Sequence, residues 1–262
     1  MFINVLNFTA YRLIRAVRYT GEIAILFWQT VCLSFVPPIK RQRILSQSKK
    51  VGPGSFLIAS LVAFFIGMII ALQMAYQMTK LSAELYIPGV VAVALARELS
   101  PVLSALIVAG RVGAGIAAEI GSMKVTEQVD ALRAFAVNPV KFLVVPRFLA
   151  LVVMLPVLTI FADIVGVFGG YVICVHKLGI SSPMFFQMVF NTLNASDIMT
   201  GLVKTIFFGA IIALVGCHQG LCVSGGAEGV GRATTRSVVI SFIMIIMCDC
   251  LFTTIFNYIL KL

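Results

Sequence analysis

The sequence predicts an all-α polytopic membrane protein with five transmembrane helices, and composition and hydropathy patterning both lead to this fold class. The 262-residue chain is 60% hydrophobic and only 11% charged, whereas a soluble domain of this length carries about a quarter charged residues. Its apolar residues gather in five runs, each close to the roughly 20 residues that a helix needs to cross a bilayer. Lipid is therefore the solvent for most of the chain.

Few charges interrupt these five runs. The first has none, and the second contains only the adjacent pair Arg97 and Glu98. The third and the fifth contain one acid each, Asp163 and Asp249, and the fourth contains no charge. We expect one domain over residues 1–262, with spans at residues 51–79, 85–110, 148–175, 205–222 and 237–260.

The basic residues predict the orientation of these spans. Eight lie in the first 50 residues, five between the second and third spans, and two before the fifth span. These fifteen fall on one side, whereas only Lys80, Lys177, Lys204 and Lys261 fall on the other. The positive-inside rule therefore places the amino terminus in the cytoplasm and the carboxyl terminus outside. The same asymmetry accounts for the net charge of +10, so we expect no nucleic-acid partner.

Two segments outside the spans have the pattern of interfacial helices. "FTAYRLIRAVRY" (residues 8–19) places arginines three apart among apolar residues, which is typical of a helix lying in the membrane interface. The stretch that follows is too short before Pro37 and Pro38 for a clear span. We expect an interfacial or half-inserted elbow within residues 1–50, with a sixth span as the alternative. After the third span, residues 182–195 predict a short amphipathic helix on the outer side.

Small residues recur at a spacing of four along the second span and its continuation. Such a ridge lets two helix backbones approach closely, and van der Waals contact then drives their association. The pattern predicts tight helix packing and supports a homodimer seam only weakly. The ridge consists of Ala105, Ala109, Gly113, Ala117 and Gly121.

The charges within the spans should face protein or a wet cavity, because each costs several kcal/mol if it faces lipid. One interpretation is that they pair with one another for assembly, and the other is that they line a cavity that receives a phosphate headgroup. Arg97 and Glu98 are adjacent and point about 100° apart on a helix. We therefore expect that the two side chains cannot both pair with partners across one face of that helix. Pro101 should kink the second span.

Residues 121–147 form a polar island between the second and third spans. Within it, "TEQVDALRAFAV" (126–137) predicts an amphipathic helix that Thr126 caps, with Glu127 and Asp130 in its early turns and Arg133 later. Asn138-Pro139 should end this helix. It is either a docking helix or an ordinary interfacial loop helix.

Motifs for chemistry are weak. "CHQGLC" (217–222) offers two sulfurs and one histidine without a fourth ligand, so we expect no metal site. "GAEGVGRA" (226–233) lacks the Lys and Ser/Thr of a phosphate-binding loop and follows a membrane span rather than a strand. No nucleophile and base are grouped, so we expect no catalytic residue and no cofactor on this chain.

The block "ARELSPVLSALIVAGRVGAGIAAEIGSMKVTEQVDALRAFAVNPVKFLVVPR" (96–147), together with "GRATTRSVV" (231–239), resembles the MlaE/YrbE permease family of ABC transporters. The resemblance implies a homodimer in the bacterial inner membrane that moves phospholipids between the two membranes and helps to maintain outer-membrane lipid asymmetry. It implies three further partners: a cytoplasmic ABC ATPase that binds ATP-Mg, a STAS-domain protein and a periplasmic MCE-domain protein.

The resemblance also implies roles for residues. The segment 122–138, around Glu127, Asp130 and Arg133, would be the coupling helix that seats in the ATPase. A lipid cavity would be lined by the first, second and fifth spans, and the outer loop 176–203 matches no motif for the MCE partner. The lipid-binding residues implied are Arg97, Glu98, Leu72, Tyr76 and Met78, with looser matches at Lys204 and Asp249.

An ion-coupled secondary transporter that uses Glu98, Asp163 and Asp249 is the alternative function. The sequence shows no inverted repeat, and both the odd number of spans and the polar island count against this class. The direction of transport and the lipid species stay open.

Overall fold

The computed structural model of the chain describes residues 2–36 and 41–259, and its regular elements there are all helices, joined by short turns and loops. The side chains of residues 1–16, Asn257 and Ile259 are also outside this description, so Arg12, Arg15, Lys40 and Lys261 of the charge count are not placed. Five helices or helix series are long and apolar enough to cross a membrane. The predicted fold class is therefore confirmed.

The spans are longer than predicted. The first is α2 (Arg41–Met78), which continues into a 3-10 turn, η1 (Thr79–Leu81). The third is α7 (Val145–His176), which a π-helical turn, η5 (Val140–Val144), precedes. The fourth is α9 (Ala195–Leu221), and the fifth is α10 (Gly226–Thr254), which a π-helical turn, η6 (Ile255–Ile259), follows.

The second span is assembled from short helical pieces. After a 3-10 turn, η2 (Glu84–Tyr86), it consists of α3 (Ile87–Ala94), α4 (Ser100–Val108) and α5 (Ala114–Val125). π-Helical turns join these pieces: η3 (Leu95–Leu99) precedes α4 and η4 (Ala109–Gly113) precedes α5. A kink was predicted at Pro101, and the structure has a π-helical turn, η3, just before this proline.

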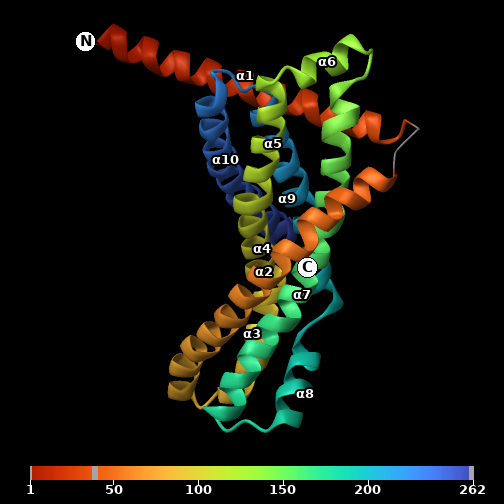
Figure 1. Cartoon of the computed structure of the whole chain (residues 1–262). Coiled ribbons are helices and arrows are strands. Elements are labelled where there is room, and N and C mark those ends of the chain that lie inside the picture. Colours follow the sequence, from red (N-terminus) through yellow and green to blue (C-terminus); the bar gives the residue numbers. More distant parts are fainter. Residues whose placement is uncertain (1, 37–40, 260–262) are drawn as a thin grey trace.

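The first helix, α1 (Phe2–Ser34), lies across the end of the bundle (Figure 1). It is one continuous helix and not one of the five candidate spans. Its Ile23 and Leu26 are buried in the main hydrophobic core, whereas Trp28 and Phe35 are exposed. The elbow prediction requires a helix that runs across the bundle and buries one edge, as α1 does. The structure therefore does not favour a sixth span.

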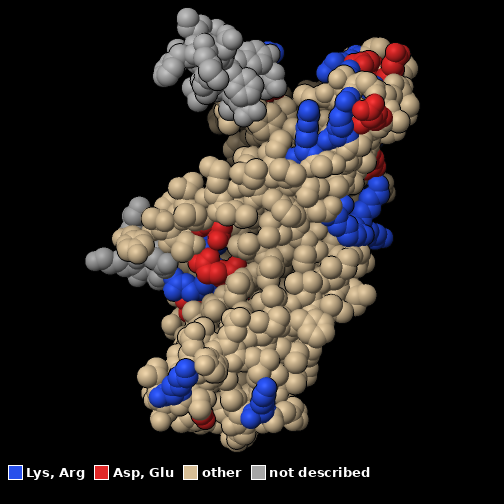
Figure 2. All heavy atoms as spheres, turned by 90° about the vertical axis from the view of Figure 1, so that its left-hand side faces the viewer, with Lys and Arg blue, Asp and Glu red and all other residues tan. Residues whose placement is uncertain are grey.

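The two short helices lie at opposite ends of the bundle (Figure 1). The helix α6 (Gln128–Ala134) shares its end with α1, and α8 (Ser182–Thr192) lies at the other end. The predicted outer helix 182–195 is therefore three residues shorter than expected, because Asn194 caps α9 instead. Figure 2 shows most charged side chains near one end, a few at the other end, and a middle that is mostly uncharged except for one mixed group of acids and bases.

Small residues bring the spans into backbone contact. A side chain on Gly67 of α2 would collide with the carbonyl oxygen of Gly166 on α7, so the two helices can approach this closely only because Gly67 lacks a Cβ. The whole ridge from Ala105 to Gly121 is buried, and Gly113 and Gly121 face Ile212 and Val223, within and just after α9. The ridge is thus a seam within one chain.

Candidate functional site

Lys204 of α9 is the centre of a charged cluster that joins three spans. Its Nζ lies 2.6 Å from Oε2 of Glu98 on η3 and 2.9 Å from Oδ1 of Asp249 on α10. It also donates to the hydroxyl of Thr253 at 2.8 Å, and that hydroxyl donates to the Glu98 carboxylate. The Lys204 side chain is 1% exposed and that of Glu98 is 38% exposed. Each buried charge therefore has an opposite partner, which offsets the cost of removing it from water.

Arg97 also pairs with a residue of α9, Asp197. Its guanidinium lies 3.4 Å from Oδ1 of Asp197, and the Arg97 side chain is 24% exposed. Asp197 has a second task, because its Oδ2 accepts the backbone N–H of Asn194 at 3.0 Å as part of a capping box at the start of α9. Sequence reasoning missed Asp197, since the fourth span was predicted to begin ten residues later than it does.

The expectation that Arg97 and Glu98 cannot both pair across one face is wrong. Both contact α9, because their partners Asp197 and Lys204 are seven residues apart and so share one face of that helix. The two residues also lie in the π-helical turn η3 and not in the regular α-helix for which the angle was calculated. π-Helical turns of this kind are frequent at functional sites.

Gly201 explains how η3 and α9 come so close. It lies between Asp197 and Lys204 in α9, and a Cβ at this position would collide with the carbonyl oxygen of Ala96. Only glycine allows this approach, and the approach brings both basic–acidic pairs within reach. The local backbone of α9 is therefore part of the site.

Asp163 stands apart from this cluster. On α7, it lines an apolar cavity of about 340 Å³ together with aromatic residues of α8, among them Phe185 and Phe186. Among the described residues, no hydrogen bond or ion pair joins Asp163 to Glu98 or Asp249. The three acids of the ion-coupled alternative thus do not form one site.

The three residues predicted to contact lipid from the first span lie near the carboxyl-terminal end of α2, the end that the charge distribution predicts to be the outer one. Leu72 and Met78 pack against a hydrophobic cluster of α2, α3, α7 and α8. Tyr76 is 71% exposed, and Lys80 Nζ lies 4.3 Å from the centre of its ring. Leu72 and Tyr76 line a cavity of about 500 Å³. The structure therefore unites Glu98, Lys204 and Asp249, with Arg97 beside them, but not the residues of the first span.

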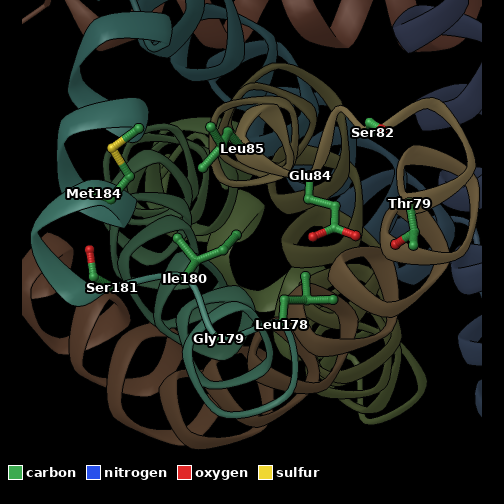
Figure 3. Close-up of a pocket in the computed structure, with 9 residues that line it drawn as sticks. All are labelled: Thr79, Ser82, Glu84, Leu85, Leu178, Gly179, Ile180, Ser181 and Met184. Carbon is green, nitrogen blue, oxygen red and sulfur yellow. The ribbon is translucent and has the colours of Figure 1, made fainter.

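A second cavity opens at the same outer end, with a volume of about 610 Å³. It shares Thr79 and Leu178 with the cavity beside Tyr76. Figure 3 shows the carboxylate of Glu84 and the side chains of Leu178 and Ile180 pointing into the opening. This outer mouth is thus partly acidic and partly apolar.

The predicted coupling helix differs from the structure in its bounds. Residues 122–125 belong to α5, and Thr126 does not cap a new helix, since its hydroxyl bonds back to the carbonyls of Ser122 and Met123. Residue Glu127 precedes α6 with φ +60° and without a capping hydrogen bond from its side chain. The helix ends at Ala134, four residues before the predicted stop, and the side chain of Asn138 accepts the N–H of Val140 instead.

The three residues predicted to contact the ATPase divide into two groups. Asp130 accepts Lys124 Nζ at 2.7 Å and Arg133 Nη1 at 3.2 Å, and the bond from Lys124 holds the pKa of Asp130 below its usual range. Glu127 is exposed. The bond between Lys124 and Asp130 thus fixes α6 to α5, and Arg133 pairs with Asp130 within α6, whereas Glu127 is left exposed.

Sequence reasoning missed two further features of this segment. Phe135, just after α6, is 80% exposed, although an aromatic ring in water has no stabilising contact. Glu119 of α5 lies 3.1 Å from Lys50 Nζ on α2 and 3.0 Å from the buried Arg147 on α7. The amphipathic pattern placed no weight on Phe135, and Glu119 has partners 69 and 28 residues away, which a local pattern cannot show.

One group of His, Cys and Glu side chains in the described part of the chain is close enough to share a metal ion. It consists of Glu22, His218 and Cys222 and lies where α1 crosses α9. It is separate from the charged cluster at Lys204, and none of its members belongs to that cluster.

Comparisons with known proteins agree with one another. The family model described as permease MlaE matches residues 44–255. The chain is 41% identical to a "Probable ABC transporter permease protein" of Rickettsia felis, over 98% of this chain and 99% of the relative. It is 42% identical to a protein with the same description from a Synechocystis strain, over 91% and 88%. It is 35% identical to the Arabidopsis thaliana "Protein TRIGALACTOSYLDIACYLGLYCEROL 1, chloroplastic", over 90% and 67%.

Proposed function

The chain belongs to the MlaE family of ABC transporter permeases, and on that basis we propose that it forms the membrane pathway of an ATP-driven phospholipid transporter. It is a multi-pass transport subunit, and a permease of this class works with an ATPase on a separate chain. Lipid as the cargo is supported by the name of the Arabidopsis relative, which refers to a glycerolipid.

The charged cluster around Lys204 is the observation that carries the proposal. In an otherwise apolar region it keeps two members accessible, Arg97 and Glu98, which have opposite charges. A phospholipid headgroup with a phosphate and an ammonium has the complementary pair. The guanidinium would donate two parallel hydrogen bonds to the phosphate, and the carboxylate would accept hydrogen bonds from the ammonium. Leu72, Tyr76 and Met78 would contact acyl chains nearer the outer mouth.

The segment around α6 supports coupling to the ATPase. Its charged residue Glu127 and its aromatic residue Phe135 are both exposed, and interfaces often depend on an aromatic anchor with charges at the rim. We propose that Phe135 inserts into a groove of the ATPase and that Glu127 sets the docking geometry. Movement would reach the spans through Glu119, which contacts both α2 and α7.

The remaining assembly follows from family membership. We propose a homodimer in the bacterial inner membrane, with a STAS-domain protein and a periplasmic MCE-domain protein. The proposed setting is supported by the bacterial relatives that match nearly the full chain. The outer mouth with Glu84 would face the periplasmic partner, and transport would help to maintain outer-membrane lipid asymmetry. The match to an ABC family favours this function over the ion-coupled alternative.

A paired substitution tests the lipid role of Arg97. Arg97→Ala alone would leave Asp197 buried without this partner, so we combine it with Asp197→Asn. The measurements are phospholipid bound per purified complex and ATP-dependent lipid transfer between vesicles. We expect both to fall by roughly tenfold, about the contribution of one charge-assisted interaction. The matched control removes an exposed pair, Arg232→Ala with Glu228→Gln, and should change neither. Unaltered lipid content and transfer would restrict Arg97 to a structural role.

A further inference from the structure

The crossing of α1 and α9 holds a compact group of polar side chains that have no role in the function proposed above. Tyr19 of α1 meets His218 of α9 edge to face, with ring centres 5.1 Å apart, and its hydroxyl accepts Gln219 Nε2 at 3.0 Å. One turn further along α1, Glu22 reaches the same histidine. These contacts tie the elbow helix to the end of the fourth span.

Three atoms of this group converge as metal ligands do. His218 Nε2 lies 3.2 Å from Glu22 Oε2 and 3.8 Å from Cys222 Sγ, and all three ligand atoms lie within 4.8 Å of one another. Tetrahedral zinc with bonds of about 2.0 Å to N and O and about 2.3 Å to S would separate N from O by roughly 3.3 Å and N from S by roughly 3.5 Å. The two distances to Nε2 are therefore close to those of a zinc site.

The surroundings orient each ligand. The other oxygen of the Glu22 carboxylate, Oε1, is held by Arg18 at 3.1 Å, which leaves Oε2 directed at His218. His218 is buried and Cys222 is exposed, so one side of the group is fixed by packing and the other is open to solvent. His218 and Cys222 are four residues apart and so share one side of the end of α9.

We propose that Glu22, His218 and Cys222 form a site for a zinc-type divalent cation, with water as the fourth ligand. The thiol of Cys222 binds as the thiolate, and its proton is released to solvent. A thiolate, an imidazole and a carboxylate are a ligand set that zinc accepts. The bound cation would clamp α1 against the cytoplasmic end of α9, and the proposal holds whatever cargo the permease carries.

The pattern "CHQGLC" alone did not predict this site, because the third ligand lies 196 residues away in sequence. Cys217, the other sulfur of that pattern, is completely buried and does not belong to the group. The structure thus replaces one of the two sulfurs with a carboxylate from another helix.

Metal retention by the purified full-length permease tests the proposal. The protein carries no polyhistidine tag, is stripped with EDTA, loaded with Zn²⁺ or Co²⁺ and desalted. We expect one metal ion per chain by elemental analysis, a thiolate-to-cobalt charge-transfer band with Co²⁺, and a higher Tm with Zn²⁺. Cys222→Ser and Glu22→Gln should each weaken binding at least tenfold, and Cys222→Ser should abolish the band.

The matched control is Cys32→Ser, since Cys32 is an exposed cysteine on α1 outside the group. It should leave stoichiometry, band and Tm shift unchanged. His218→Ala should remove binding, and if that variant does not fold, the exposed Cys222 carries the test. The proposal is overturned if the wild-type protein retains no metal, which would make Glu22 and His218 a hydrogen-bonded pair only. It is equally overturned if Cys222→Ser and Cys32→Ser behave alike.

Discussion

The cluster at Lys204 and the segment around α6 both contain paired charges, but the pairs have different physical consequences. Lys204 is 1% exposed and touches residues of two other spans, whereas Asp130 and Arg133 are 45% and 63% exposed and lie three residues apart. Breaking a buried pair leaves an uncompensated charge, which is strongly destabilising. An exposed pair is worth 1 kcal/mol or less, as a rough median. Charge therefore holds spans together in the first region, and in the second it is available to a partner.

The helices that carry these charges also differ in length and in their stability as isolated helices. The Lys204 cluster depends on α9, a 27-residue helix. The helix α6 has 7 residues, too few to be stable alone. It is held by burial of Val129 and by the bond from Lys124 to Asp130. The segment around α6 can thus respond to a partner at little cost in the fold of the spans.

The largest effect is expected from removing the cation at the centre of the Lys204 cluster. Lys204→Met leaves Glu98 and Asp249 close together without their cation, and we expect a loss of stability of about 3–5 kcal/mol. The measurement is thermal unfolding of the permease in nanodiscs, together with the yield of folded protein.

A neutral version of the cluster is the control for that prediction. Lys204→Met combined with Glu98→Gln and Asp249→Asn removes all three charges, and stability should return toward that of the wild type while bound phospholipid stays low. If Lys204→Met alone unfolds at the wild-type temperature, the cluster does not join the spans energetically.

A smaller effect on stability, but a clear one on assembly, is expected in the segment around α6. Glu127→Lys reverses an exposed charge, so the permease should keep its Tm. Capture of the ATPase should weaken by roughly tenfold, about 1.4 kcal/mol. Co-purification of the ATPase and lipid-stimulated ATP hydrolysis measure this.

The matched control for Glu127 is Glu84→Lys, which reverses an acid at the outer end of the bundle. It should leave ATPase capture unaltered. Equal capture by the wild type and the Glu127→Lys variant would show that the ATPase docks elsewhere. A loss of capture with a lower Tm would instead assign Glu127 to the fold.

The two regions also differ in how well the sequence predicted them. The five spans follow from composition, because about 20 apolar residues have few alternatives to crossing the bilayer. Arg97, Glu98 and Asp249 could be named as charged residues within apolar runs, whereas Lys204 was implied only by the family resemblance. Which of them pair, and the role of Asp197, could not be predicted, since the π-helical turn η3 and the contact of Gly201 with Ala96 depend on tertiary packing.

For the segment around α6, the sequence predicted that a helix is present but not where the helix begins and ends. An amphipathic pattern identified a helix there, yet its start moved from Thr126 to Gln128 because α5 continues to Val125. Glu127 and Ala136, just outside the two ends of α6, have positive φ angles. Neither Glu nor Ala is a residue type from which a positive φ would be predicted. Local propensity cannot predict backbone that packing from neighbouring helices imposes.

The smallest expected effect concerns protonation of Asp130. Its pKa is lowered from 3.8, first by the hydrogen bond from Lys124 and least by the charge of Arg133. Because the folded pKa lies below the unfolded one, the contribution to stability is present above about pH 4 and is lost as the pH falls through the folded pKa. Carbon NMR of the Asp130 carboxyl should therefore give a pKa below 3.8 in the folded permease. Lys124→Met should raise it more than Arg133→Gln does. A pKa at or above 3.8 in the wild type, or a larger shift from Arg133→Gln, would mean that α6 is not held to α5 by Lys124. The segment around α6 would then lack the fixed geometry that docking requires.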